Sequence, residues 1–147
     1  KDVEDDEIWG FLLKGNQEPG AFCCDNGTFR EIISLQVRSM QRQKIDAQLT
    51  ILRLNSQEPD QEKRAIYMKQ METTLQKSLR SGDPFTRVGA NQFWVLLPGA
   101  SNENGKIVMD RVINRMHKDY PRTEAAFRVR VLDLEGLNSR MAAGSNQ

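Results

Sequence analysis

The sequence is poor in the residues that usually bind metals or cross-link secreted chains. It has two cysteines and one histidine in 147 residues, and the cysteines are adjacent, at Cys23 and Cys24. Neighbouring cysteines make no disulfide framework, and His117 without a Cys-x-x-Cys pair leaves a structural zinc site almost no ligands. We therefore expect no metal, no cofactor and a reducing, cytoplasmic environment.

Long apolar runs and a strong excess of either charge are missing as well. No apolar run approaches the roughly 20 residues that a membrane-spanning helix needs, and the acidic start at residues 1–6 is unlike a signal peptide. The net charge is +1, which implies neither an acidic tail nor a strongly basic nucleic-acid-binding surface. Because the chain does not begin with methionine, we expect an excised piece of a longer protein, about one domain in size.

The first 44 residues are expected to form a helical arm. Clustered apolar side chains predict a short helix over residues 4–14, and a second helix is predicted up to about Gln43. Three side chains could cap the start of the second helix: Asp25, Asn26 and Thr28. The apolar faces of both helices could pack on the rest of the domain or form a homodimer, and their period does not decide between these alternatives.

The pattern changes at residue 45 to that of an α+β domain, which we place at residues 45–135. Apolar and polar residues alternate up to about Asn55, as in a strand, and a helix with Gly82 as its expected stop follows. A hairpin, another helix and a strand near residues 127–131 complete the order. This order predicts a ferredoxin-like, antiparallel four-stranded sheet with helices on one face. We expect residues 136–147 to be a flexible tail.

The most specific motif lies on the turn of the predicted hairpin. It reads Gly89-Ala90-Asn91-Gln92-Phe93 and leads into an apolar strand. The segment resembles the Gly-Gly-Asp/Glu-Glu-Phe signature of the GGDEF family, the diguanylate cyclases, which join two GTP molecules. This resemblance implies the palm-like fold of those cyclases, in agreement with the order of the elements. Both carboxylates of the signature are replaced here by the amides of Asn91 and Gln92.

The resemblance also implies that the cyclase chemistry is lost. Attack of a ribose 3′-hydroxyl on an α-phosphate needs divalent cations, which prefer carboxylate ligands. The family places these carboxylates on its first strand and on the turn, at positions that fall here on Arg53, Asn55, Asn91 and Gln92. Arg53 would repel a cation, although it could equally be an ordinary solvent-facing strand residue. We therefore expect no enzymatic activity.

One functional motif of the family is matched. Arg80-Ser-Gly-Asp83 has the form of the Arg-x-x-Asp motif that lies five residues before the signature and forms an inhibitory cyclic di-GMP site in the family. A guanidinium can pair with phosphate or a guanine edge, and a carboxylate can accept guanine N–H groups. The same residues are also explained by termination of the preceding helix, because Arg80 suits a last turn, Gly82 a C′ position and Asp83 a turn.

A second resemblance concerns the lead-in at residues 20–42. It is similar to the C-terminal end of some bacterial regulators that join a SARP-type winged-helix DNA-binding domain to a bacterial transcriptional activator (BTAD) helical-repeat domain. This implies the regulatory end of a transcription factor, without its DNA-binding domain. We expect an inactive sensory domain that acts through other domains or a protein partner, without nucleic acid or membrane. The alternative is a cyclic di-GMP receptor that uses Arg80 and Asp83.

Overall fold

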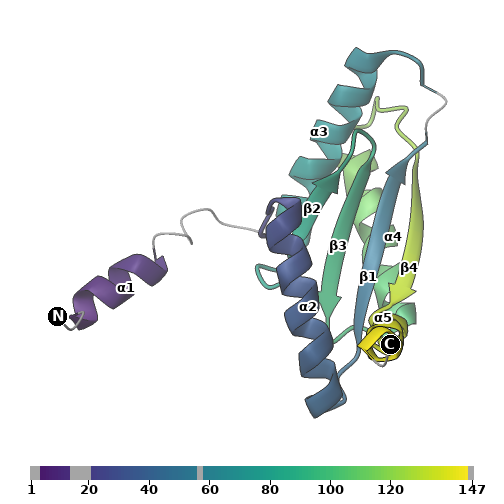
Figure 1. Cartoon of the computed structure of the whole chain (residues 1–147). Coiled ribbons are helices and arrows are strands. Elements are labelled where there is room, and N and C mark those ends of the chain that lie inside the picture. Colours follow the sequence, from purple (N-terminus) through teal and green to yellow (C-terminus); the bar gives the residue numbers. More distant parts are fainter. Residues whose placement is uncertain (1–3, 14–20, 56–57, 146–147) are drawn as a thin grey trace.

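A four-stranded antiparallel sheet forms the centre of the structure, a computed structural model that describes residues 4–13, 21–55 and 58–145 (Figure 1). The strands lie in the order β2-β3-β1-β4: β1 (Ala47–Leu54), β2 (Phe85–Val88), β3 (Gln92–Pro98) and β4 (Phe127–Asp133). The helices are α1 (Asp5–Leu13), α2 (Asn26–Gln43), α3 (Gln61–Ser78), α4 (Asn102–Asp119) and α5 (Leu134–Ser145). This confirms the predicted α+β fold. Among the described residues, no helix is both long and apolar enough to cross a membrane.

Polar side chains begin three of the helices. Asp25, Asp60 and Ser101 precede α2, α3 and α4, and each accepts a hydrogen bond from a backbone N–H of the first turn, at 2.7, 2.9 and 3.2 Å respectively. Such N-caps satisfy donors that have no partner within the helix and typically contribute about 1 kcal/mol each. Of the three capping candidates that the sequence offered for α2, the structure shows Asp25 as the N-cap.

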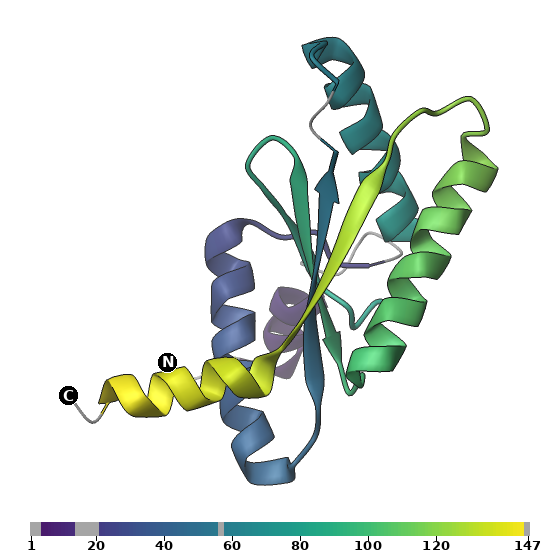
Figure 2. The ribbon, with the colours of Figure 1, turned by 90° about the vertical axis from the view of Figure 1, so that its right-hand side faces the viewer.

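The main core lies between the sheet and the pair of helices α3 and α4 (Figure 2). Leu52 and Leu54 of β1 face this core, because alternate side chains of a strand point to the same side. Phe85 and Phe93, both fully buried, meet edge to face across the β2–β3 hairpin, with ring centroids 6.1 Å apart and planes at 65°. The last residue of the turn motif, Phe93, is therefore a core residue.

Helices also cover part of the opposite face of the sheet, in addition to the predicted layer. Helices α2 and α5 lie on this side (Figure 2). The buried residues of α2 pack there with Ala47, Leu96 and Leu134: Phe29, Ile33, Val37 and Met40. The apolar face of α2 therefore packs on the sheet of its own chain. For this helix, packing on the rest of the domain is correct, and not the homodimer that the sequence left open.

Residues 136–145 are helical, which differs from the expected flexible tail, while residues 146–147 lie outside the described part of the chain. Helix α5 follows β4 directly, and Oδ1 of Asp133 accepts a hydrogen bond from the backbone N–H of Glu135 at 3.0 Å. Leu134 is only 2% exposed and belongs to the second core. Contacts with α2 hold α5 in place. The small, polar composition of this segment therefore did not predict a helix.

We expect Phe93→Ala to lower the free energy of unfolding by about 3–5 kcal/mol, because it removes a fully buried ring and leaves a cavity. Urea denaturation followed by circular dichroism measures this change. Ile66→Ala on α3 is the control, since Ile66 is 54% exposed and a surface substitution usually changes stability by about 0.5 kcal/mol or less. Equal effects of the two substitutions would contradict the placement of Phe93 in the core.

Candidate functional site

The turn between β2 and β3 carries the residues that resemble the signature. Gly89 has a φ of +65°, a left-handed conformation that glycine adopts without steric cost. The guanidinium of Arg87 donates hydrogen bonds to the backbone carbonyls of Gly89 and Ala90, both at 3.3 Å. The local sequence and this side chain together fix the conformation of the turn.

The structure places Arg53 beside Gln92. Their Cα atoms are direct partners in the β1–β3 register, and the next residue, Leu54, donates its N–H to the carbonyl of Asn91 at 2.8 Å. Cross-strand partners share a face of the sheet, and this is the face that α2 partly covers. Oε1 of Gln92 accepts a hydrogen bond from the indole N–H of Trp94 at 2.9 Å. Two positions at which the resemblance predicts carboxylates therefore meet, but they hold a guanidinium and an amide whose oxygen already accepts a hydrogen bond.

A small pocket of about 220 Å³ opens near the end of β1. It contains two carboxylates, Glu58 and Glu124, that the sequence analysis missed. They are far apart in sequence and lie in segments joined by the hydrogen bond from the N–H of Asn55 to the carbonyl of Ala126, at 2.8 Å. Within residues 4–13, 21–55 and 58–145, no three His, Cys, Asp or Glu side chains are grouped so that they could hold a metal ion.

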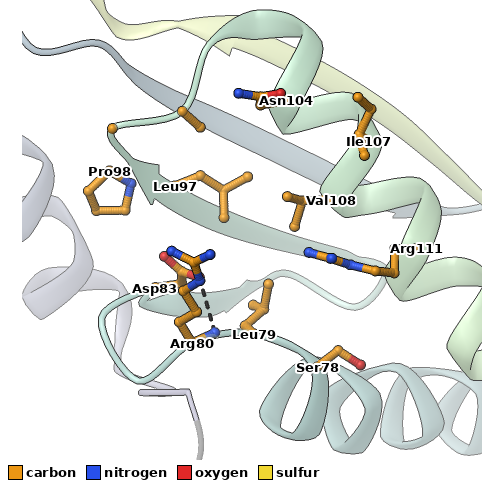
Figure 3. Close-up of a pocket in the computed structure, with 12 residues that line it drawn as sticks. Ser78, Leu79, Arg80, Asp83, Leu97, Pro98, Asn104, Ile107, Val108 and Arg111 are labelled. Atoms are coloured by element: carbon orange, nitrogen blue, oxygen red, sulfur yellow. Dashed lines mark hydrogen bonds between the residues drawn. The ribbon is translucent and has the colours of Figure 1, made fainter.

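Arg80 and Asp83 lie in a turn after α3. The expected place of Arg80 in the last helical turn is therefore wrong, whereas Asp83 lies in a turn as expected. The helix ends at Ser78, because Leu79 already has extended backbone angles. The N–H of Asp83 donates to the carbonyl of Arg80 at 3.0 Å, and the N–H of Arg80 donates to Oδ2 of Asp83 at 3.1 Å (Figure 3). Asp83 therefore closes the turn, and the expected stop at Gly82 lies beyond the end of the helix.

This turn borders a pocket of about 260 Å³ between the end of β3 and helix α4 (Figure 3). Arg111 and Asn104 of α4 line the same pocket, so it contains two guanidinium groups, one carboxylate and one amide. The sequence analysis missed the two α4 residues. They are seven positions apart, a spacing that places them on one helix face, but only the packing of α4 over the turn brings that face to Arg80.

Burial raises the pKa of the Asp83 carboxyl above its usual value, and the hydrogen bond from the Arg80 backbone and the Arg80 charge oppose this rise. The charged carboxylate is therefore less favourable in the folded chain than in the unfolded one. For a group whose pKa is raised in the folded state, the associated cost is present at neutral pH and disappears as the pH falls below the pKa of the unfolded state.

We expect Asp83→Asn to be more stable than the wild type at about pH 7, and this advantage to shrink towards about pH 4, because only the wild type carries the partly buried charge. The amide oxygen can still accept the hydrogen bond from Arg80. Urea denaturation at both pH values measures the difference, with Asp110→Asn on the exposed surface of α4 as the control. An advantage that grows on acidification would contradict this assignment.

No protein-family model and no curated protein matches the sequence. Solved structures match it in fold. A DGC protein from Thermotoga maritima superposes with a TM-score of 0.63 at 11% identity, over 77% of this chain and 81% of that one. The GGDEF domain of FimX from Pseudomonas aeruginosa gives a TM-score of 0.65 at 15% identity, over 80% of this chain and 78% of that one. The fold is that of the GGDEF domains.

A third GGDEF structure shows the fold as part of a longer protein. The S helix-GGDEF-EAL structure of LapD from Vibrio cholerae, bound to c-di-GMP, has a TM-score of 0.54 and 13% identity. The match covers 87% of this chain but only 31% of that one. These similarities confirm the predicted palm-like fold. At such low identities they assign no role to a residue, so the function of the GGDEF-like domain has to be argued from its own side chains.

Proposed function

We propose that this GGDEF-like domain has no cyclase activity and acts as a regulatory domain, through contacts with other domains or proteins. The observation that supports this proposal is the position of Arg53 opposite Gln92 in the β1–β3 register. A guanidinium at this place repels the divalent cations that GTP chemistry requires, and no carboxylate on the turn compensates for it. The position of the domain at the end of a SARP-type regulator stays a prediction, because the three structures compared above are of other GGDEF proteins.

The pocket near the end of β1 is a poor substitute for a nucleotide site. Its volume of about 220 Å³ is below the range of about 300–1,000 Å³ that is typical of small-molecule sites. Oε1 of Glu58 accepts a hydrogen bond from the N–H of Asp60 at 3.1 Å, so this carboxylate already organises the start of α3. Glu124 is exposed. One carboxylate of this pocket is already hydrogen-bonded and the other is exposed to solvent, which supports the proposed lack of activity.

We expect no conversion of GTP into cyclic di-GMP above the blank, with either Mg²⁺ or Mn²⁺, because the turn offers no carboxylate for the cation. Chromatography of the nucleotides after incubation with the purified chain measures this, and an active diguanylate cyclase assayed in parallel is the positive control. Product formation that disappears in Glu58→Gln or Glu124→Gln would show that the second pocket is a catalytic site, and would refute the proposal.

A second candidate function is reception of cyclic di-GMP at the pocket beside Arg80. Arg80 and Arg111 are exposed and could pair with phosphate, while the carboxylate of Asp83 could accept guanine N–H groups. The pocket, at about 260 Å³, is also below the range typical of small-molecule sites, so only part of the dinucleotide would lie in it. The hydrogen bonds that Asp83 makes in the turn account for this residue without a ligand, so we place this function second.

If the pocket is a receptor site, calorimetry with cyclic di-GMP should give micromolar binding, and Arg80→Ala and Arg111→Ala should each weaken it by about tenfold or more. Arg115→Ala is the matched control, since this α4 arginine is paired with Asp119 at 2.9 Å and does not line the pocket. Absence of binding to the wild type would rule out the receptor function and leave the regulatory proposal standing.

A further inference from the structure

Helix α1 carries an apolar surface that the single chain leaves uncovered. None of its residues is buried, and it lies apart from the sheet and the other helices (Figure 1). Five of its large apolar side chains are 44–80% exposed: Ile8, Trp9, Phe11, Leu12 and Leu13. The first turn is acidic, with Asp5, Asp6 and Glu7. Because an isolated helix of this length is marginal in water, we expect it to be stabilised by packing.

The face of the sheet that carries α2 and α5 contains a matching apolar groove of about 350 Å³. Most of its lining is apolar: Phe29, Ile33, Leu49, Val88, Trp94 and Leu137. Arg30 of α2 stands in the same lining. The groove therefore offers cover for aromatic and aliphatic side chains together with a positive charge.

Next to this groove, arginines form a positively charged row on β1 and β4. Arg53 is the cross-strand partner of Arg128, and Ile51 lies between Trp94 and Arg130 in the register. The three arginines are exposed and project from the face of Trp94, because cross-strand partners share a face. Among the residues that the structure describes, none of the three forms an ion pair. The arginine row and the apolar groove are therefore neighbours on the face of the sheet that carries α2 and α5.

We propose that α1 of a second copy of the chain binds this face, with its apolar side chains in the groove and its acidic first turn on the arginine row. Both kinds of surface on α1 then meet their complement. Ile8, Phe11 and Leu12 lie on one face of α1, because their spacing is i, i+3 and i+4. This face, with Phe11 as its aromatic side chain, would supply the buried anchors that commonly dominate interfaces. In the single chain α1 stays away from its own groove (Figure 1), whereas exchange of α1 between two copies makes the same contact twice by symmetry. This inference does not depend on the proposed loss of activity.

Analytical ultracentrifugation of the complete chain tests the exchange. We expect a concentration-dependent dimer that Phe11→Glu weakens by about tenfold or more, since the substitution places a charge in the apolar groove. The fold should tolerate this change, because Phe11 is 80% exposed. Ile66→Glu is the matched control, an exposed apolar residue on α3 that should leave the dimer unchanged. A monomeric wild type, or a dimer insensitive to Phe11→Glu, would overturn the proposal.

A charge exchange tests the orientation of α1. Arg128→Glu combined with Arg130→Glu should weaken the dimer by about tenfold or more, and adding Asp5→Lys and Asp6→Lys should restore it. Circular dichroism confirms that the variants are folded. Failure of the added lysines to restore the dimer would overturn the proposed contact. A monomer whose α1 amides are protected from hydrogen exchange would mean that α1 occupies its own groove, which also refutes binding to a second copy.

Discussion

Every layer of the domain depends on the pairing of β1, which hydrogen-bonds to β3 on one side and to β4 on the other. Its even-numbered residues face the core under α3 and α4, and Ala47 and Leu49 face α2 and α5. A shift of this register by one residue would turn each set to the wrong face. The same register places Arg53 opposite both Gln92 and Arg128. The core and the chemistry near the turn are thus fixed by one set of backbone hydrogen bonds.

The features that the sequence predicted correctly are those set by neighbouring residues. Alternation of apolar and polar residues predicted β1, Asp25 was among the candidates for the start of α2, and the residues from Gly89 to Gln92 predicted the turn of the hairpin. The order of these elements was sufficient for the antiparallel sheet, because a strand, a helix and a hairpin of these lengths have few ways to pack. The register that places Arg53 beside Gln92 was not predicted and is seen only in the structure.

The features that escaped prediction depend on contacts between distant segments. The spacing of Phe29, Ile33 and Val37 predicted an apolar face on α2 but not the surface that it covers. Helix α5 has a small, polar sequence and is anchored through Leu134, whose burial depends on α2 and the sheet. Arg111 reaches the pocket beside Arg80 only because α4 packs over the turn. Such contacts carry no local sequence signal.

The differences from the GGDEF signature have a physical consequence beyond the loss of a cation site that we propose. A carboxylate at residue 53 would attract a divalent cation, whereas Arg53 extends the positive row that continues through Arg128. The amide oxygen of Gln92 accepts a hydrogen bond from the indole N–H of Trp94 and so helps to orient a side chain that lines the apolar groove. Both substitutions therefore act on the same face of the sheet. In our interpretation, the residues to which we attribute a loss of cyclase chemistry also build a surface suited to an acidic, apolar helix.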